Sequence, residues 1–148
     1  MHRVPLLCYA TDNAFDRSSV KAIIGLRFPQ AKLHLVENGE ELLGWLESQA
    51  PDRLPHILLL DFLLPHQTGY LHLGKIAAIN GCESIPTILF MEGSSSGISP
   101  ECVPKYQGGR CVQKSSPLDG MEKELTEAIL AICRSFPSEP AYSALAGV

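Results

Sequence analysis

The feature that most constrains the fold is a regular alternation of short apolar runs with longer amphipathic segments. Runs of strand length and apolar character recur five times, at 3–10, 32–36, 57–60, 85–90 and 110–113. Apolar residues at helical spacing occupy the segments between and after them, at 14–28, 38–50, 68–79 and 117–136, with a short or broken helix around 100–107. This alternation favours parallel strands joined by right-handed crossovers. The sequence therefore predicts an α/β fold, a doubly wound five-stranded parallel sheet with helices on both faces.

Size and charge limit the classes of protein that are possible. A chain of 148 residues suits one domain, which we expect at 1–136, while 137–148 lacks periodicity and is expected to be a C-terminal tail that is loose or docks elsewhere. A net charge of -4, with only 12 Lys and Arg, gives no basic stripe for direct nucleic-acid binding. No run approaches the ~20 apolar residues of a membrane span, and the first apolar run is too short for a signal peptide. We therefore expect a cytoplasmic protein with no membrane contact.

Charged residues follow several of the predicted strands. The first strand ends at Thr11 and Asp12, the third runs directly into Asp61, the fourth ends at Met91 and the fifth reaches Lys114. A charge directly after a buried strand is unfavourable unless it is solvated, paired or metal-bound. The carboxyl ends of parallel strands meet at one edge of the sheet, where ligands bind. Two aspartates and a lysine are thus predicted to converge on one site.

A longer pattern surrounds Asp61. In the segment DFLLPHQTG, a proline stands four residues and a glycine, Gly69, eight residues after the aspartate. Together with Pro86 in the fourth strand and Lys114 after the fifth, this segment resembles the receiver domains of bacterial two-component response regulators. The resemblance covers residues 3 to about 134. It implies a flavodoxin-like sheet with strand order 2-1-3-4-5, and a signalling module rather than an enzyme.

The same resemblance implies a phosphoryl-transfer site. A histidine kinase or histidine phosphotransfer protein would transfer a phosphoryl group to Asp61, the phosphoacceptor. Asp12, Asp61 and the backbone carbonyl of Leu63 would hold Mg²⁺, and Lys114 would pair with the phosphoryl oxygens. This chemistry needs a carboxylate nucleophile, a hard cation with oxygen ligands and a fixed ammonium group. The signal would then pass to an unknown protein target by direct contact.

The chain departs from the family pattern at several positions, including Ser115 in place of the proline that follows the lysine. Thr11 replaces the first of two acidic residues after the first strand. In the switch region, Met91 stands where the family has a threonine or serine, Glu92 where it has a small residue, and Cys111 where it has an aromatic residue. A thioether cannot donate the hydrogen bond that a hydroxyl group would give. These changes affect the readout of phosphorylation more than the acceptor itself.

Two interpretations therefore stay open. Either Asp61 is phosphorylated and signals by an unusual route, or the chain is a degenerate pseudo-receiver, a protein-binding scaffold that works without phosphorylation. The survival of Asp12, Asp61 and Lys114 favours the first, although Asp12 could merely cap the helix that follows it. A flavodoxin-type enzyme is disfavoured because the loop after the first strand lacks a glycine-rich phosphate cradle and offers a carboxylate instead.

Overall fold

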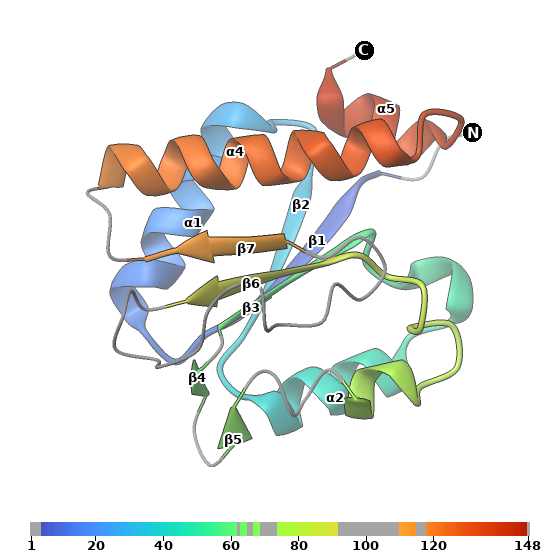
Figure 1. Cartoon of the computed structure of the whole chain (residues 1–148). Coiled ribbons are helices and arrows are strands. Elements are labelled where there is room, and N and C mark those ends of the chain that lie inside the picture. Colours follow the sequence, from blue (N-terminus) through green and yellow to red (C-terminus); the bar gives the residue numbers. More distant parts are fainter. Residues whose placement is uncertain are drawn as a thin grey trace.

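The core of the molecule is a parallel β-sheet (Figure 1). The computed structural model describes residues 4–61, 63–64, 67–68, 74–91, 110–114 and 118–147. Five strands pair in the order β2-β1-β3-β6-β7, which confirms the predicted order. Their bounds are β1 Leu6–Ala10, β2 Lys32–Val36, β3 Ile57–Asp61, β6 Thr87–Met91 and β7 Arg110–Gln113.

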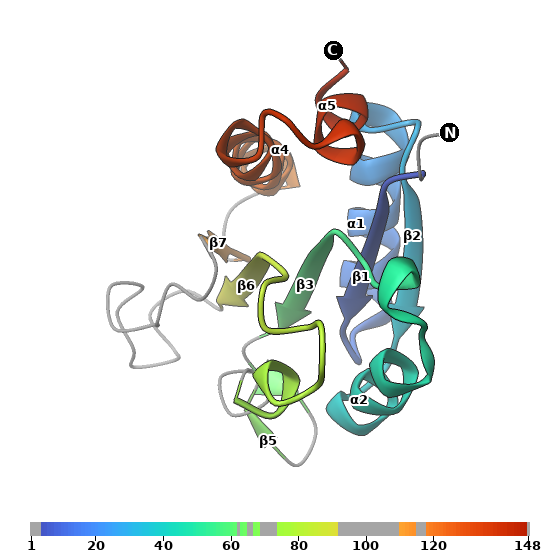
Figure 2. The ribbon, with the colours of Figure 1, turned by 90° about the vertical axis from the view of Figure 1, so that its right-hand side faces the viewer.

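Helices cover both faces of this sheet (Figures 1 and 2). One face carries α1 (Ala14–Arg27), α4 (Leu118–Ser135) and α5 (Pro140–Ala146), and the other carries α2 (Gly39–Ser48) and a helical turn at 74–77. A 3₁₀ turn, η1 (Pro51–Arg53), precedes β3. The side chain of Asn13 caps the start of α1 and that of Asn38 caps α2, each accepting a hydrogen bond from a backbone N–H of the first turn. The predicted three-layer α/β fold is therefore correct.

The two-residue period of the strands divides the core into two clusters. Leu7 and Tyr9 of β1 point toward α1 and α4, whereas Cys8 and Ala10 point toward α2. All five residues of β3 are buried, as expected for a central parallel strand covered on both faces. Because Ile57 and Leu59 pack on the α1 and α4 face, Asp61 follows them to that same face. The fold thus fixes the side of the sheet on which Asp61 lies.

One segment differs from the sequence-based prediction, and a second predicted segment falls outside the described residues. The helix expected at 68–79 starts too early, because Thr68 belongs to the short strand β5 (Gln67–Thr68), which pairs antiparallel with β4 (Leu63–Leu64). Antiparallel pairing with Leu63 places Thr68 in a strand, a conformation that suits a β-branched residue. The turn at 74–77 agrees with the expected helix. The broken helix expected at 100–107 lies outside the described residues.

The C-terminal tail, expected to be loose or to dock elsewhere, contains helix α5 and packs on the domain itself. Ala141, Tyr142 and Leu145 are buried. The Tyr142 hydroxyl group donates a hydrogen bond of 2.8 Å to the carbonyl oxygen of His56, the residue before β3, and the Tyr142 ring stacks on Phe136. Seven residues are too few to give a helical period in the sequence, so tertiary burial determines this helix. None of the helices described is long and apolar enough to cross a lipid bilayer.

Candidate functional site

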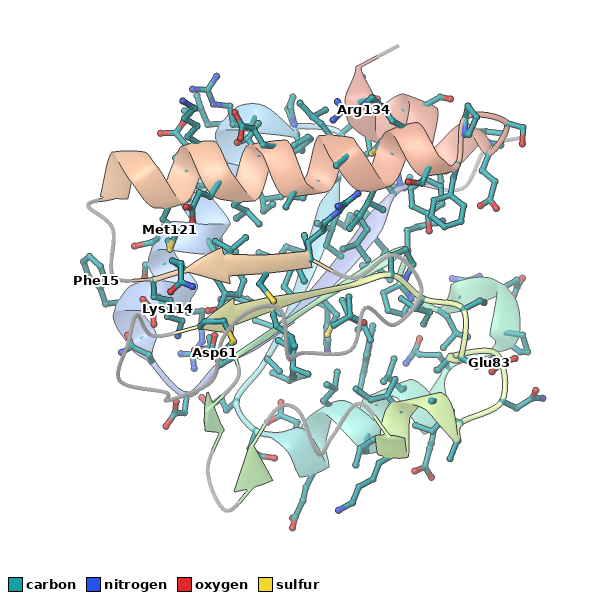
Figure 3. All side chains as sticks on the ribbon, in the orientation of Figure 1. Phe15, Asp61, Glu83, Lys114, Met121 and Arg134 are labelled. Atoms are coloured by element: carbon teal, nitrogen blue, oxygen red, sulfur yellow. The ribbon has the colours of Figure 1, made fainter. Side chains whose placement is uncertain are left out.

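The register of β1 against β3 determines which side chains meet Asp61. Leu7 lies opposite Ile57 and Tyr9 lies opposite Leu59, so continuing the register by two residues brings Thr11 level with Asp61. Tyr9, Thr11 and Asp61 therefore share the face that is covered by α1 and α4. The site lies at the carboxyl ends of the strands, as predicted, and Figure 3 shows Asp61 and Lys114 next to one another there.

Three donors surround the Asp61 carboxylate. The Tyr9 hydroxyl group donates to Oδ1 at 2.7 Å, and the Thr11 hydroxyl group donates to Oδ2 at 2.5 Å. The ammonium group of Lys114 lies 2.8 Å from the same Oδ2 atom. Asp61 is only 2% exposed. Since a carboxylate offers about four lone-pair positions, Oδ2 is saturated and Oδ1 keeps one position free.

Lys114 joins this carboxylate to helix α1. Its backbone N–H donates to the carbonyl oxygen of Met91 at 2.7 Å, which places the residue directly after β7. Its ammonium group contacts Asp16 Oδ2 at 2.7 Å as well as Asp61. The Lys114 side chain is 10% exposed and that of Asp16 is 14% exposed. One half-buried ammonium group thus bridges two carboxylates from different elements.

Burial and pairing act in opposite directions on these ionisable groups. Burial raises the pKa of Asp61 above its usual value, and the Lys114 charge with the three hydrogen bonds opposes that rise without cancelling it. Burial alone would lower the pKa of Lys114, but the carboxylates of Asp61 and Asp16 outweigh it and the net direction is upward. Burial and the Asp61 charge raise the pKa of Tyr9, so its hydroxyl group stays protonated and can donate. Lys114 therefore stays protonated, whereas the Lys114 charge and the hydrogen bonds offset only part of the cost of burying the Asp61 carboxylate.

Asp12 lies at the same edge but is exposed. The alternative that Asp12 caps the following helix is wrong, because the N-cap is Asn13, whose side-chain oxygen accepts from the Asp16 N–H at 2.9 Å. Asp12 thus has no capping role in α1. The backbone around it is held by Thr11, whose carbonyl oxygen accepts from Arg17 and whose hydroxyl oxygen accepts from the Asn13 N–H at 3.1 Å.

The oxygen atoms predicted to hold Mg²⁺ fit a hard cation in kind. Asp12 and Asp61 offer carboxylates, Leu63 offers a backbone carbonyl, and Mg²⁺ commonly binds one or two carboxylates and keeps several waters. Asp61 Oδ1 retains one unused lone-pair position for such a ligand. Within the described ranges there is no group of three or more His, Cys, Asp and Glu side chains arranged for a metal. The fit of these residues to Mg²⁺ therefore rests on the type of their oxygen atoms.

The predicted switch residues lie on the other side of the sheet or outside the described chain. Met91 is fully buried and packs in the cluster next to α2, facing away from the side on which Asp61 lies. Cys111 is half-buried against the same cluster. Glu92 lies outside the described residues. Met91 and Cys111 thus act as packing residues in this structure.

Tyr9 and Asp16 belong to the site although the sequence did not indicate them. Tyr9 lies inside an apolar run and counts as a strand residue, and Asp16 resembles any acidic residue in the first turn of a helix. The available signal for Tyr9 was its position two residues before Thr11, on the same face of the strand. No such signal exists for Asp16, whose partner Lys114 is 98 residues away.

Comparisons with known proteins give a consistent result for the fold. Neither the scan against protein-family models nor the search of curated proteins finds a match. Among solved structures, the Mn²⁺-bound response regulator Rcp1 matches at 18% identity and a TM-score of 0.69, covering 86% of this chain and 92% of that one. The phosphorylated cyanobacterial phytochrome response regulator RcpA matches at 18% identity and a TM-score of 0.71, covering 95% of this chain and 99% of that one.

A third structure with this fold holds a magnesium ion. It is the receiver domain of a sensor histidine kinase from Pseudomonas aeruginosa, with the ion coordinated in its active-site cleft. It matches at 18% identity and a TM-score of 0.63, covering 84% of this chain and 97% of that one. At these identities the similarity establishes the fold of the chain.

Proposed function

We propose that this chain, which has the fold of a response regulator receiver domain, accepts a phosphoryl group on Asp61 and signals in the cytoplasm by contact with another protein. The phosphoryl donor would be a histidine kinase or a histidine phosphotransfer protein. The observation that carries this proposal is the Asp61 carboxylate at the end of the central strand with the Lys114 ammonium group 2.8 Å away. A carboxylate nucleophile beside a fixed cation is what phosphoryl transfer requires.

In the proposed step an Asp61 oxygen attacks the phosphorus atom. A P–O bond to the carboxylate forms while the P–N bond to the donor histidine breaks, and the imidazole leaves with the bonding electron pair. Lys114 balances charge on the phosphoryl oxygens, and Asp16 keeps its ammonium group at the site. When bound by Asp12, Asp61 and the Leu63 carbonyl, Mg²⁺ would neutralise further charge on the incoming group. The product carries about 1.5 to 2 negative charges.

The degenerate scaffold is the second candidate, and it too has an observation in its favour. Asp61 is almost completely buried under three donors, and Met91 packs away from it without a hydroxyl group to bond a phosphoryl oxygen. A receiver fold that merely displays its surface would need neither a reactive acceptor nor a switch. In that case Asp61 and Lys114 would form a structural ion pair.

Intact-mass spectrometry separates the two candidates. The protein is incubated with a small-molecule phosphodonor, with and without Mg²⁺, and compared with its Asp61→Asn and Asp52→Asn variants. We expect a phosphoryl adduct that depends on Mg²⁺ and on Asp61, and that survives replacement of the exposed Asp52. No adduct on the natural chain, together with partner binding that Asp61→Asn does not change, would favour the scaffold.

A further inference from the structure

We propose that the hydroxyl groups of Tyr9 and Thr11 form a clamp that restricts access to Asp61, and that the Tyr9 hydroxyl group competes with divalent cations and with the phosphoryl group for Asp61 Oδ1. Thr11 and Lys114 occupy both lone-pair positions of Oδ2, while Tyr9 occupies one position of Oδ1. The part that concerns the phosphoryl group rests on the proposed function. The part that concerns the cation stands without it.

The position of the Tyr9 side chain restricts access to Asp61 Oδ1. Tyr9 is fully buried, its ring packs against Phe90 with centroids 5.1 Å apart, and its hydroxyl group reaches Oδ1 at 2.7 Å. A ligand that approaches Oδ1 therefore meets a side chain that cannot leave without disturbing the core. Such a ligand must either share Oδ1 with the hydroxyl group or displace it.

The hydroxyl group of Tyr9 has no use in packing. A phenylalanine would make the same ring contact with Phe90, and a buried hydroxyl group is unfavourable unless it is paired. The Tyr9 hydroxyl group donates to the Asp61 carboxylate, and a hydrogen bond to a charged acceptor is stronger than one to a neutral acceptor. The hydroxyl group therefore acts on Asp61 rather than on the packing of the core.

Thr11 holds the other half of the clamp rigidly. Its N–H donates to the carbonyl oxygen of Val36 at 3.0 Å, and its hydroxyl oxygen accepts from the Asn13 N–H while donating to Asp61 Oδ2. These bonds fix the direction of the hydroxyl proton. Because Oδ2 stays saturated by Thr11 and Lys114, a new ligand finds its opening at Oδ1.

The decisive variant is Tyr9→Phe, which removes the hydroxyl group and keeps the ring. A hydrogen bond to a charged group corresponds to roughly ten- to hundred-fold in an equilibrium constant. We expect calorimetric titration to give at least a roughly ten-fold tighter Mg²⁺ affinity for Tyr9→Phe than for the natural chain, and we expect adduct formation with the small-molecule phosphodonor to be faster by a similar factor. Tyr142→Phe is the matched control, since it also removes one hydroxyl hydrogen bond from a buried tyrosine but lies at the opposite edge of the sheet.

A second pair of variants tests the clamp from the other side. Thr11→Val removes the hydroxyl group at nearly constant volume, whereas Thr11→Ser keeps it. We expect Thr11→Val to bind Mg²⁺ more tightly and Thr11→Ser to match the natural chain. This pair tests the clamp independently of Tyr9→Phe, so the proposal stays testable if one of the variants fails to fold, which circular dichroism would reveal.

Each outcome has a defined meaning. Unchanged or weaker Mg²⁺ affinity in every variant that folds, of Tyr9→Phe and Thr11→Val, overturns the clamp, because the hydroxyl groups would then only compensate a buried charge. Tighter Mg²⁺ binding with an unchanged rate of adduct formation overturns the competition with the phosphoryl group. If no variant forms an adduct but Tyr9→Phe binds Mg²⁺ more tightly, the proposed function fails and the clamp on the cation stands.

Discussion

The variant Lys114→Met should reveal how much the charge of Lys114 stabilises the Asp61 and Asp16 carboxylates in the folded protein. Methionine keeps most of the length and apolar surface of the side chain and removes the ammonium group. Asp61 then loses a cation at 2.8 Å, and Asp16 loses one at 2.7 Å. At an effective dielectric constant of about 20, each such pair attracts by about 6 kcal/mol before the desolvation of its members is subtracted.

The net loss of stability is smaller and has an upper bound. Breaking a buried pair destabilises proteins by about 3–5 kcal/mol. Without Lys114, Asp61 can take up a proton instead of staying charged. Keeping a carboxyl of pKa 3.8 neutral at about pH 7 costs about 4 kcal/mol, and this cost is the upper bound on the Asp61 part of the loss. Part of that cost is already present, since the pKa of Asp61 is raised in the natural protein. We therefore expect a loss of about 3 kcal/mol at neutral pH, from Asp61 and Asp16 together.

The loss should depend on pH in one direction. The folded-state pKa of Asp61 lies above its unfolded value of 3.8, and removing Lys114 raises it further. The folded state then binds more protons than the unfolded state between these values, so stability falls as pH rises through that window. The difference between the variant and the natural protein should be large at about pH 7 and small near pH 4.

Urea unfolding at both pH values measures this difference. Trp45, the single tryptophan, stacks on His34 at 4.1 Å in the fold and reports unfolding by its fluorescence. Lys32→Met, which removes an exposed lysine from β2, is the control. The double variant Lys114→Met with Asp61→Asn should recover the Asp61 part of the loss, because position 61 then no longer buries a carboxylate, while Asp16 stays without its cation. A loss under about 1 kcal/mol, or an equal loss at both pH values, would refute the reasoning.

Three further stability changes follow from other contacts, each measured by urea unfolding. Asn13→Ala removes the N-cap of α1 and should cost about 1 kcal/mol, and no loss would mean that water replaces the cap. Tyr142→Ala should cost about 3 kcal/mol and speed amide hydrogen exchange in α5, whereas equal exchange would show that α5 docks without this ring. Gly81→Ala should cost about 1–2 kcal/mol, because φ is +90° and a Cβ would lie 3.0 Å from Leu54 Cδ1, and an unchanged midpoint would contradict the strain.

The sequence predicts the fold well wherever burial leaves a periodic pattern. The run Ile57 to Leu60 is apolar throughout because β3 is covered on both faces, and Asp61 stands out because it ends that run. The convergence of Asp61 with Lys114 is predictable from topology, since both follow parallel strands. The strand order came from the resemblance to receiver domains.

The remaining features depend on long-range geometry that one sequence does not contain. The role of Tyr9 requires the register of β1 on β3, because its partner Asp61 is 52 residues away. Helix α5 is too short for a period, and the burial of Tyr142 against the residue before β3 determines it. Thr68 in β5 reflects pairing with β4 rather than helix propensity.

The shared ammonium group of Lys114 links helix α1 to the occupancy of Asp61. An ammonium group has three N–H bonds, and the structure directs it to Asp16 and Asp61 at once. If a ligand on Asp61 alters the contact between Lys114 and Asp16, the binding free energy of that ligand depends on Asp16, because coupling between two sites is reciprocal. Phe15, next to Asp16 in the first turn of α1, is 70% exposed and points outward from the molecule in Figure 3. The chemical state of the Asp61 carboxylate is thereby thermodynamically coupled to Asp16 in the first turn of α1.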